Sequence, residues 1–137
     1  MKKRMLFVLL ALTVLGASVT HAQTQGLVNA KVPFDFVVNG HEYASGEYSV
    51  LSTSTNNVWI LHEANGPSGF LVTSSAESNS PSDQTKLVFD CYDNRKQCFL
   101  ADFWFSGSRT GRHLPKSRHE TKLARTLAVT PAVVASK

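Results

Sequence analysis

The stretch TKLVFDCYDNRKQCFLADFWF, residues 85–105, sets the fold class of this chain. Two runs rich in Val, Phe, Tyr and Trp flank a short polar segment, and such runs bounded by turn residues are typical of β-strands. The sequence therefore predicts an antiparallel hairpin with its turn at residues 93–96. In this register Cys91 lies directly opposite Cys98.

The spacing of these two cysteines, the only ones in the chain, predicts a structural disulfide. Facing residues of a hairpin have Cβ atoms about 4.5 to 5.5 Å apart, which is close to disulfide geometry. A redox centre requires the spacing C-x-x-C at the start of a helix, whereas six residues separate this pair. A zinc site requires further ligands at tight spacing, and none flank the pair. We expect Cys91 and Cys98 to hold the hairpin together.

The second run of the hairpin, residues 97–105, is apolar on both faces. Strict alternation places three residues on one face (Cys98, Leu100 and Trp104) and three on the other (Phe99, Phe103 and Phe105). A second apolar face requires a cover. The rest of a closed barrel, the C-terminal segment and a partner protein are the three alternatives.

Further strands separated by turn signals are expected before this hairpin. The run KVPFDFVV, residues 31–38, alternates with period two and is followed by Asn39-Gly40, a pair favoured in two-residue hairpin turns. The longest loop is expected at residues 76–84. Three more predicted strands lie at residues 46–52, 57–63 and 69–74. This spacing predicts a mostly β fold, namely a single antiparallel β-sandwich or small barrel with a short C-terminal helix.

The pattern changes after Phe105. Residues 106–115 predict a loop, and Pro115 favours a helix from about residue 116 to residue 128. Its apolar stripe is narrow and consists of Leu123, Ala124, Leu127 and Ala128. Residues 129–137 lack periodicity and are expected to form a flexible tail. The β domain with its helix is therefore predicted over residues 23–128.

The N-terminus predicts export. A basic start, MKKR, precedes the apolar run at residues 5–19 and the small residues that end at Ala22. These are the three parts of a secretory signal peptide, and the apolar run is shorter than the roughly 20 residues of a membrane span. We expect a signal peptide at residues 1–22, cleavage after Ala22 and a secreted or periplasmic protein. A retained N-terminal anchor is the alternative.

Charge is distributed unevenly along the expected mature chain. Residues 23–105 carry four basic and nine acidic residues, whereas residues 106–137 carry seven basic residues and one acidic residue. The basic segment is expected to meet an external anionic surface, to dock on the acidic part of its own domain, or to remain disordered. The candidate anion-binding residues are Arg109, Arg112, Lys116, Arg118, Lys122 and Arg125.

No constellation of catalytic residues stands out in the sequence. Ser68 lies in GPSGF, which lacks the final glycine of a nucleophile elbow. The expected hairpin register sets Asp90 opposite Phe99 and Asp102 opposite Leu87, so these carboxyl groups form no acid–base pair. We therefore expect a protein that is not an enzyme.

The histidines offer no metal-binding spacing. His41, His62, His113 and His119 form neither H-x-H nor H-E-x-x-H. His62 shares a strand face with Val58, so a partly buried, hydrogen-bonded histidine is the ordinary interpretation. We expect no metal site and no cofactor.

Two stretches together resemble a known family. VPFDFVVNGHEYASGEYSV, residues 32–50, and LPKSRHETKLA, residues 114–124, resemble the PFDF…GEY opening and LPKSR close of a family of short secreted bacterial proteins of unknown function. The resemblance implies a compact β domain in which residues 116–118 are ordered. It supplies no catalytic residues, and the cysteine pair is not part of the family pattern.

These observations lead to two functional hypotheses. The first is an exported, non-enzymatic β domain that acts as a surface-binding or cell-envelope component. Its partner would be an anionic envelope surface or another envelope protein, without specific recognition of nucleic acid. The alternative is a carrier of a small apolar ligand inside a barrel. A carrier requires a large cavity lined by Phe34, Phe36, Trp59 and Trp104.

Overall fold

The computed structural model describes residues 27–137, so the predicted signal peptide and its cleavage site lie outside the described residues. This part of the chain forms eleven strands and one helix. The strands are β1 (Leu27–Val32), β2 (Phe36–Val38), β3 (His41–Tyr43), β4 (Gly46–Ser52), β5 (Val58–Glu63), β6 (Ser68–Val72), β7 (Ser74–Glu77), β8 (Lys86–Tyr92), β9 (Gln97–Trp104), β10 (Thr110–His113) and β11 (Thr130–Ala135). The helix is α1 (Arg118–Thr126).

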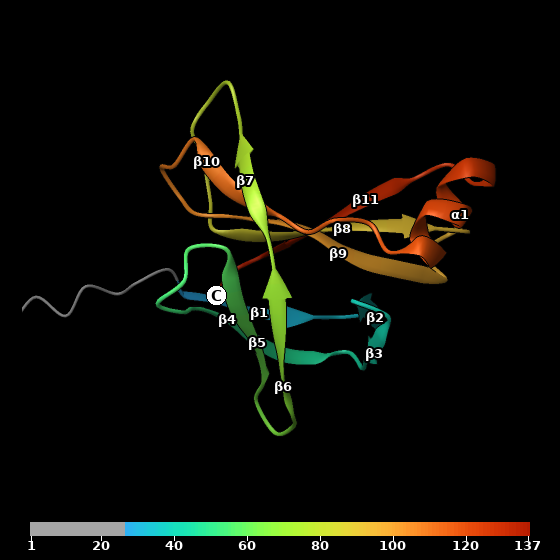
Figure 1. The fold of residues 1–137 in the computed structure, drawn as a ribbon, viewed down its shortest axis with the longest axis horizontal. Coiled ribbons are helices and arrows are strands. Elements are labelled where there is room, and N and C mark those ends of the chain that lie inside the picture. Colours follow the sequence, from blue (N-terminus) through green and yellow to red (C-terminus); the bar gives the residue numbers. More distant parts are fainter. Residues whose placement is uncertain (1–26) are drawn as a thin grey trace, which may run out of the picture.

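The strands form two sheets that face each other (Figure 1). One sheet has the order β1-β4-β5-β6, and the other has the order β11-β8-β9-β10-β7. The β2–β3 hairpin joins the second sheet through a parallel bridge between Val37 and Phe99, while the other pairings are antiparallel within the described residues. The predicted mostly β fold is confirmed as a sandwich-like arrangement. Among residues 27–137 the sheets do not close into a barrel, because neither β3 and β6 nor β1 and β11 form a strand pair.

Alternating apolar residues build the core between the sheets. In β1 the odd-numbered residues are exposed, whereas Val28, Ala30 and Val32 are buried. Side chains at alternate positions of a strand point to opposite faces, so a half-buried strand shows this pattern. An aromatic cluster occupies the centre, where Phe36 contacts the rings of Tyr48 and Phe89.

The β8–β9 hairpin follows the predicted register at its turn and departs from it further along. Cys91 pairs with Cys98 in a disulfide with an S–S distance of 2.08 Å, which confirms that prediction. A β-bulge at Val88/Phe89 then shifts the register, so Asp102 lies opposite Val88 and not opposite Leu87. One extra residue on β9 reverses which side chains face the core beyond this point.

Because of the bulge, the predicted assignment of side chains to the two faces of β9 is wrong for Phe103 and Trp104. Phe103 lies in the core opposite Leu87, whereas Trp104 lies opposite Lys86 on the outer face. The sequence prediction had placed Phe103 with Phe99 and Trp104 with Leu100. Strict alternation fails here because a bulge leaves no signal in the hydrophobic pattern of a strand that is apolar on both sides.

Several predicted strand and loop boundaries differ from those in the structure. The single strand expected at residues 31–38 is interrupted, since Pro33 lacks an N–H and β1 ends at Val32. The strands β7 and β10, which pair with each other, occupy parts of the loops expected at residues 76–84 and 106–115. Polar strands of this kind form because each supplies the other with hydrogen-bonding partners, which composition does not reveal.

The C-terminal segment is not the flexible tail that the sequence predicted. Residues 130–135 form β11, which pairs with β8 from Lys86 to Cys91. Beyond it, the backbone N–H of Lys137 donates to the carbonyl of Asn29 at 2.9 Å, which links the chain end to β1. Pairing with an existing strand edge orders this segment although its own sequence shows no periodicity.

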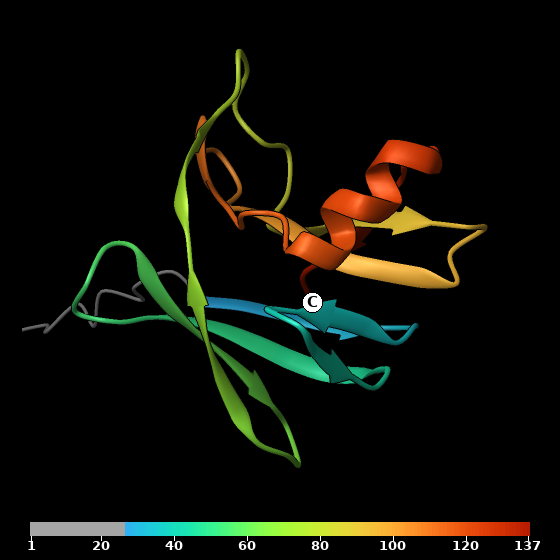
Figure 2. The ribbon, with the colours of Figure 1, turned by 45° about the vertical axis from the view of Figure 1, so that its right-hand side comes forward.

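The helix α1 covers the outer face of the β8–β9 hairpin (Figure 2). It is shorter than the predicted helix at residues 116–128, because Ser117 is its N-cap and accepts a hydrogen bond from the Glu120 N–H. Phe99 packs near the ring of His119 on this face. The C-terminal segment is therefore the cover that the second apolar face of β9 requires. No helix within residues 27–137 is long and apolar enough to cross a membrane.

Candidate functional site

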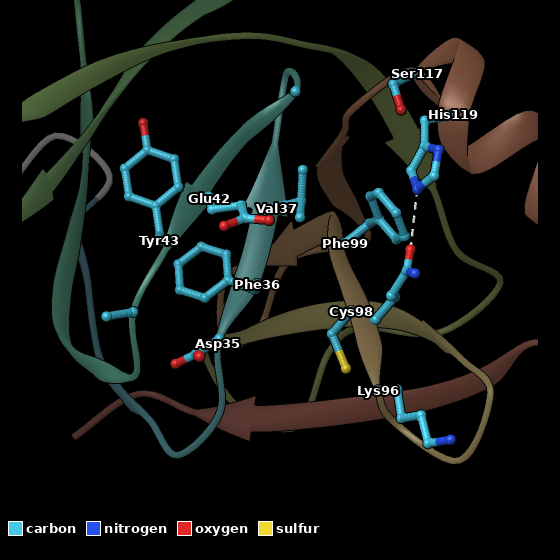
Figure 3. Close-up of a pocket in the computed structure, with 13 residues that line it drawn as sticks. Asp35, Phe36, Val37, Glu42, Tyr43, Lys96, Cys98, Phe99, Ser117 and His119 are labelled. Atoms are coloured by element: carbon cyan, nitrogen blue, oxygen red, sulfur yellow. Dashed lines mark hydrogen bonds between the residues drawn. The ribbon is translucent and has the colours of Figure 1, made fainter.

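A groove of about 650 Å³ lies between the β2–β3 hairpin and the start of α1 (Figure 3). Residues 35–37, Gly40 and residues 42–44 form one wall, and residues 96–99 of the disulfide hairpin with Ser117 and His119 form the other. Residues 32–50 and residues 114–124 are 64 or more residues apart in sequence, and both stretches contribute side chains to this groove. We call this cavity the hairpin groove.

The floor of the hairpin groove is apolar, and its walls carry charged and polar side chains beside apolar ones. Val37 and Phe99 meet at the floor, where they form the parallel bridge between β2 and β9. Glu42 lies on the wall of the β2–β3 hairpin, and Lys96 and His119 lie on the opposite wall (Figure 3). An apolar surface between opposite charges suits a ligand with an apolar body and polar groups on both sides.

Local structure positions the first wall. Asn39 and Gly40 both have positive φ values, 51° and 80°, and occupy the two central positions of the tight turn between β2 and β3. Residues that tolerate positive φ are favoured in two-residue hairpin loops, so the predicted Asn-Gly turn is confirmed. Asp35 is less available to a ligand, because its Oδ1 accepts a hydrogen bond from the Ser45 N–H at 2.9 Å.

A second set of contacts holds the opposite wall. His119 Nε2 and Gln97 Oε1 lie 3.0 Å apart, which joins α1 to the tip of the disulfide hairpin. The turn of that hairpin places Asp93, Asn94 and Arg95 in the left-handed region of φ. The disulfide between Cys91 and Cys98 anchors this turn at its base. This wall is therefore fixed to both β9 and α1.

Lys116 ties the helix to the sheet below it. Its Nζ lies 2.9 Å from Asp90 Oδ2, 3.1 Å from Glu120 Oε2 and 3.3 Å from the Tyr92 hydroxyl. Burial opposes the charged form of Lys116, but hydrogen bonds to Asp90, Glu120 and Tyr92 outweigh it and raise the pKa of Lys116 above its usual value. For Tyr92, whose charged form is the anion, burial raises the pKa. Lys116 remains charged because it has two carboxylate partners.

The candidate anion-binding residues separate into two groups. In the first group, the side chains of Arg112 and Lys116 form hydrogen bonds with other residues of the domain. The Nε of Arg112 donates to Thr73 Oγ1 at 2.9 Å, and its Nη2 donates to Asn57 Oδ1 at 2.9 Å. The remaining four are exposed, and they are Arg109, Arg118, Lys122 and Arg125. Lys116 therefore bonds to carboxylates of its own domain, whereas Arg112 bonds to the neutral groups of Thr73 and Asn57.

The histidines and aspartates outside the groove make local pairs. His62 is exposed, contrary to the expected partial burial, and its Nδ1 lies 2.7 Å from Ser68 Oγ on the neighbouring strand. The bulge-shifted Asp102 faces the next strand and lies 2.6 Å from His113 Nδ1. Within residues 27–137, no group of three or more His, Cys, Asp or Glu side chains is arranged to hold a metal ion.

The four aromatic residues expected around a carrier cavity do not line a common space. Phe34 and Phe36 pack against Phe89 with ring centroids 5.0 and 5.2 Å apart. Trp59 packs against Phe103 at 5.0 Å. Trp104 lies on the outer face of its sheet, beside Gly111. Their rings therefore fill the core or lie outside it.

Sequence reasoning did not find the residues of the hairpin groove. Val37, Glu42 and Gln97 have no unusual spacing, and only the fold brings them together. The two motif stretches were the one signal that pointed to this region. No family model matches this chain, and no curated protein or solved structure matches it. The case for a site therefore rests on geometry.

Proposed function

We propose that this protein is an exported, non-enzymatic β domain that binds a component of the cell envelope through the hairpin groove. The observation that carries the proposal is the meeting of residues 32–50 and 114–124 at one groove. The resemblance of these stretches to a family of short secreted bacterial proteins is part of the same proposal. The ligand has an apolar body that lies on Val37 and Phe99 and polar groups that reach Glu42 and His119.

Export to the periplasm or the medium agrees with the cysteine chemistry. Disulfides form and persist outside the reducing cytoplasm, and Cys91 and Cys98 are paired. A disulfide-bonded β domain is compatible with an extracytoplasmic location. The proposed signal peptide at residues 1–22 would deliver the chain there.

Expression of the full chain in a bacterium tests the export. The protein should appear in the periplasm or medium without residues 1–22 and with no free thiol, as measured by intact mass after alkylation. Full-length protein retained in the cytoplasm would contradict the proposed location. This result is independent of ligand binding.

Native mass spectrometry of the exported protein tests the groove. We expect an adduct of defined mass on the wild-type protein, and the substitution Val37→Lys should remove it because a charge then lies on the apolar floor. Val133→Lys is the matched control, since Val133 is 54% exposed on β11, outside the residues that line the groove. An absent adduct, or one that Val37→Lys leaves unchanged, would refute binding in the hairpin groove.

A further inference from the structure

A second cleft, of about 490 Å³, separates β3 from β6 on the other side of the β2–β3 hairpin. We propose that this cleft, the open seam, binds an extended peptide segment as an added strand between β3 and β6. The inference does not depend on the function proposed for the hairpin groove. It rests on backbone groups of the two strands that have no neighbouring strand in the described part of the chain, and on the charge of the seam.

The free edge of β6 points into the open seam. Asn39 Nδ2 donates to the carbonyl oxygen of Phe70 at 3.1 Å, so this carbonyl is directed away from β5 and toward the β2–β3 hairpin. In an antiparallel pair the N–H and C=O of one residue point to the same side, and the side alternates along the strand. The backbone groups of Ser68, Phe70 and Val72 therefore lie along the edge of β6 that has no strand partner in the described part of the sheet.

The free edge of β3 faces the same space. In a two-residue hairpin the residues that flank the turn exchange backbone hydrogen bonds, and these are Val38 and His41. The next pair, Val37 and Glu42, then points its backbone groups outward. On the β2 side this direction agrees with the bridge from Val37 to Phe99 of β9. On the β3 side, the N–H and C=O of Glu42 point toward the seam.

Side chains, not backbone hydrogen bonds, connect the two edges. The Asn39 amide reaches Phe70, and the Tyr43 hydroxyl lies so close to Gly69 that a Cβ added there would clash with it. Neighbouring strands of a sheet lie about 4.8 Å apart and bond directly. β3 and β6 therefore stand apart as two unpaired edges on either side of a cleft, which is the arrangement used in strand addition.

The charge of the seam indicates which peptides fit. Glu42 and Glu63 line it, and the described lining residues include no lysine or arginine. Phe70 is 70% exposed at its border and offers an apolar surface to a side chain of the added strand. The expected occupant is an extended segment with a lysine or arginine among β-branched residues, since such residues favour the strand conformation.

A panel of synthetic peptides tests the proposal. The probes are fluorescein-labelled seven-residue peptides that alternate threonine and valine, with Lys, Ser or Glu at the central position, and binding is followed by fluorescence anisotropy. The Lys peptide should bind best and the Glu peptide worst. Two N-methylated forms of the Lys peptide carry the methyl groups on the odd-numbered or on the even-numbered residues, and each should bind about tenfold or more weakly than the parent, because each loses the donors that face one of the two edges.

Two protein variants separate backbone recognition from side-chain contact. Phe70→Pro removes the N–H that faces the seam, and β6 tolerates proline there because this N–H makes no bond to β5. It should weaken binding of the Lys peptide about tenfold relative to Phe70→Ala, which keeps the N–H. Asn39→Gly preserves the positive φ of the turn and frees the Phe70 carbonyl, so it should tighten binding.

Several outcomes would overturn the inference. They are no binding of any peptide at about 1 mM, equal binding of the two N-methylated forms and the parent, or equal binding by Phe70→Pro and Phe70→Ala. Circular dichroism must show the same β spectrum for both variants. If Phe70→Pro does not fold, the N-methylated peptides and slowed hydrogen exchange at the Glu42 and Phe70 amides decide the matter. Concentration-dependent dimers that exclude the peptide would assign the seam to a second copy of the chain and refute the proposal.

Discussion

The substitution Lys116→Met tests the contact that holds α1 on the sheet. Glu120 is the buried member of this contact, with a side chain only 5% exposed and 3.1 Å from Lys116 Nζ. Removal of one partner from a buried ion pair costs about 3 to 5 kcal/mol, because the other charge is left unpaired. Lys116 is 42% exposed, so solvent screening reduces the expected loss of unfolding free energy to about 2 to 3 kcal/mol.

Urea unfolding at pH 7, followed by tryptophan fluorescence, measures this loss directly. Lys122→Met is the matched control on the same helix, since Lys122 is exposed, and it should change the unfolding free energy by less than about 0.5 kcal/mol. The double variant Lys116→Met/Glu120→Gln should recover much of the loss, because a neutral amide leaves no unpaired charge.

The pH dependence of this contact has a definite sign. The pKa of Lys116 is raised by its partners, so the folded state holds the proton more tightly than the unfolded chain does. The stabilisation is therefore complete below the unfolded pKa of 10.5 and is lost as the pH rises above it toward the folded pKa. A loss below about 0.5 kcal/mol in Lys116→Met at pH 7, or a double variant no more stable than the single one, would refute the reasoning.

Three further predictions concern the core, the disulfide hairpin and the outer face of the second sheet. Burial raises the pKa of Tyr48 from 10.0 to about 12, so the unfolding free energy of the wild type should fall by about 2 to 3 kcal/mol as the pH rises across this interval. Urea unfolding at alkaline pH should show a smaller fall for Tyr48→Phe. An equal dependence of the unfolding free energy on pH in both proteins would argue against burial of Tyr48 as the cause. The paired substitution Cys91→Ala/Cys98→Ala should lower the unfolding free energy by about 2 to 3 kcal/mol, and wild-type stability that is insensitive to reductant would speak against this value. Gly111→Ala should lower the unfolding free energy by about 1 to 3 kcal/mol in thermal unfolding, because the added Cβ would lie 2.7 Å from the Trp104 ring. An unchanged melting temperature would contradict this close contact.

Much of the fold was predictable because it depends on local pattern. The strand at residues 46–52 was predicted with the bounds that the structure has, since both of its ends adjoin turn residues. The Asn39-Gly40 turn was predictable because few residue pairs accept positive φ at both positions. The disulfide followed from the turn, which places the two cysteines opposite each other.

The candidate sites were not predictable in the same way. The hairpin groove joins Glu42 to His119, and the open seam joins Glu42 to Phe70, so both depend on contacts between distant segments. The basic C-terminal segment was singled out for its charge, yet Lys116 and Arg112 bond to groups that only folding brings near them. Sequence showed which residues were charged but not which charges were already paired.

The sequence by itself determined the strand-rich class, the covalent pairing of Cys91 with Cys98 and the presence of a short helix near the C-terminus. The tertiary structure alone decided the bulge that turns Phe103 inward, the pairing of β11 with β8 and the unpaired edges of β3 and β6. The physical reason is the range of the interactions. Backbone propensity and side-chain alternation act over a few residues, whereas a strand finds its partner, or fails to find one, only when the whole chain has packed.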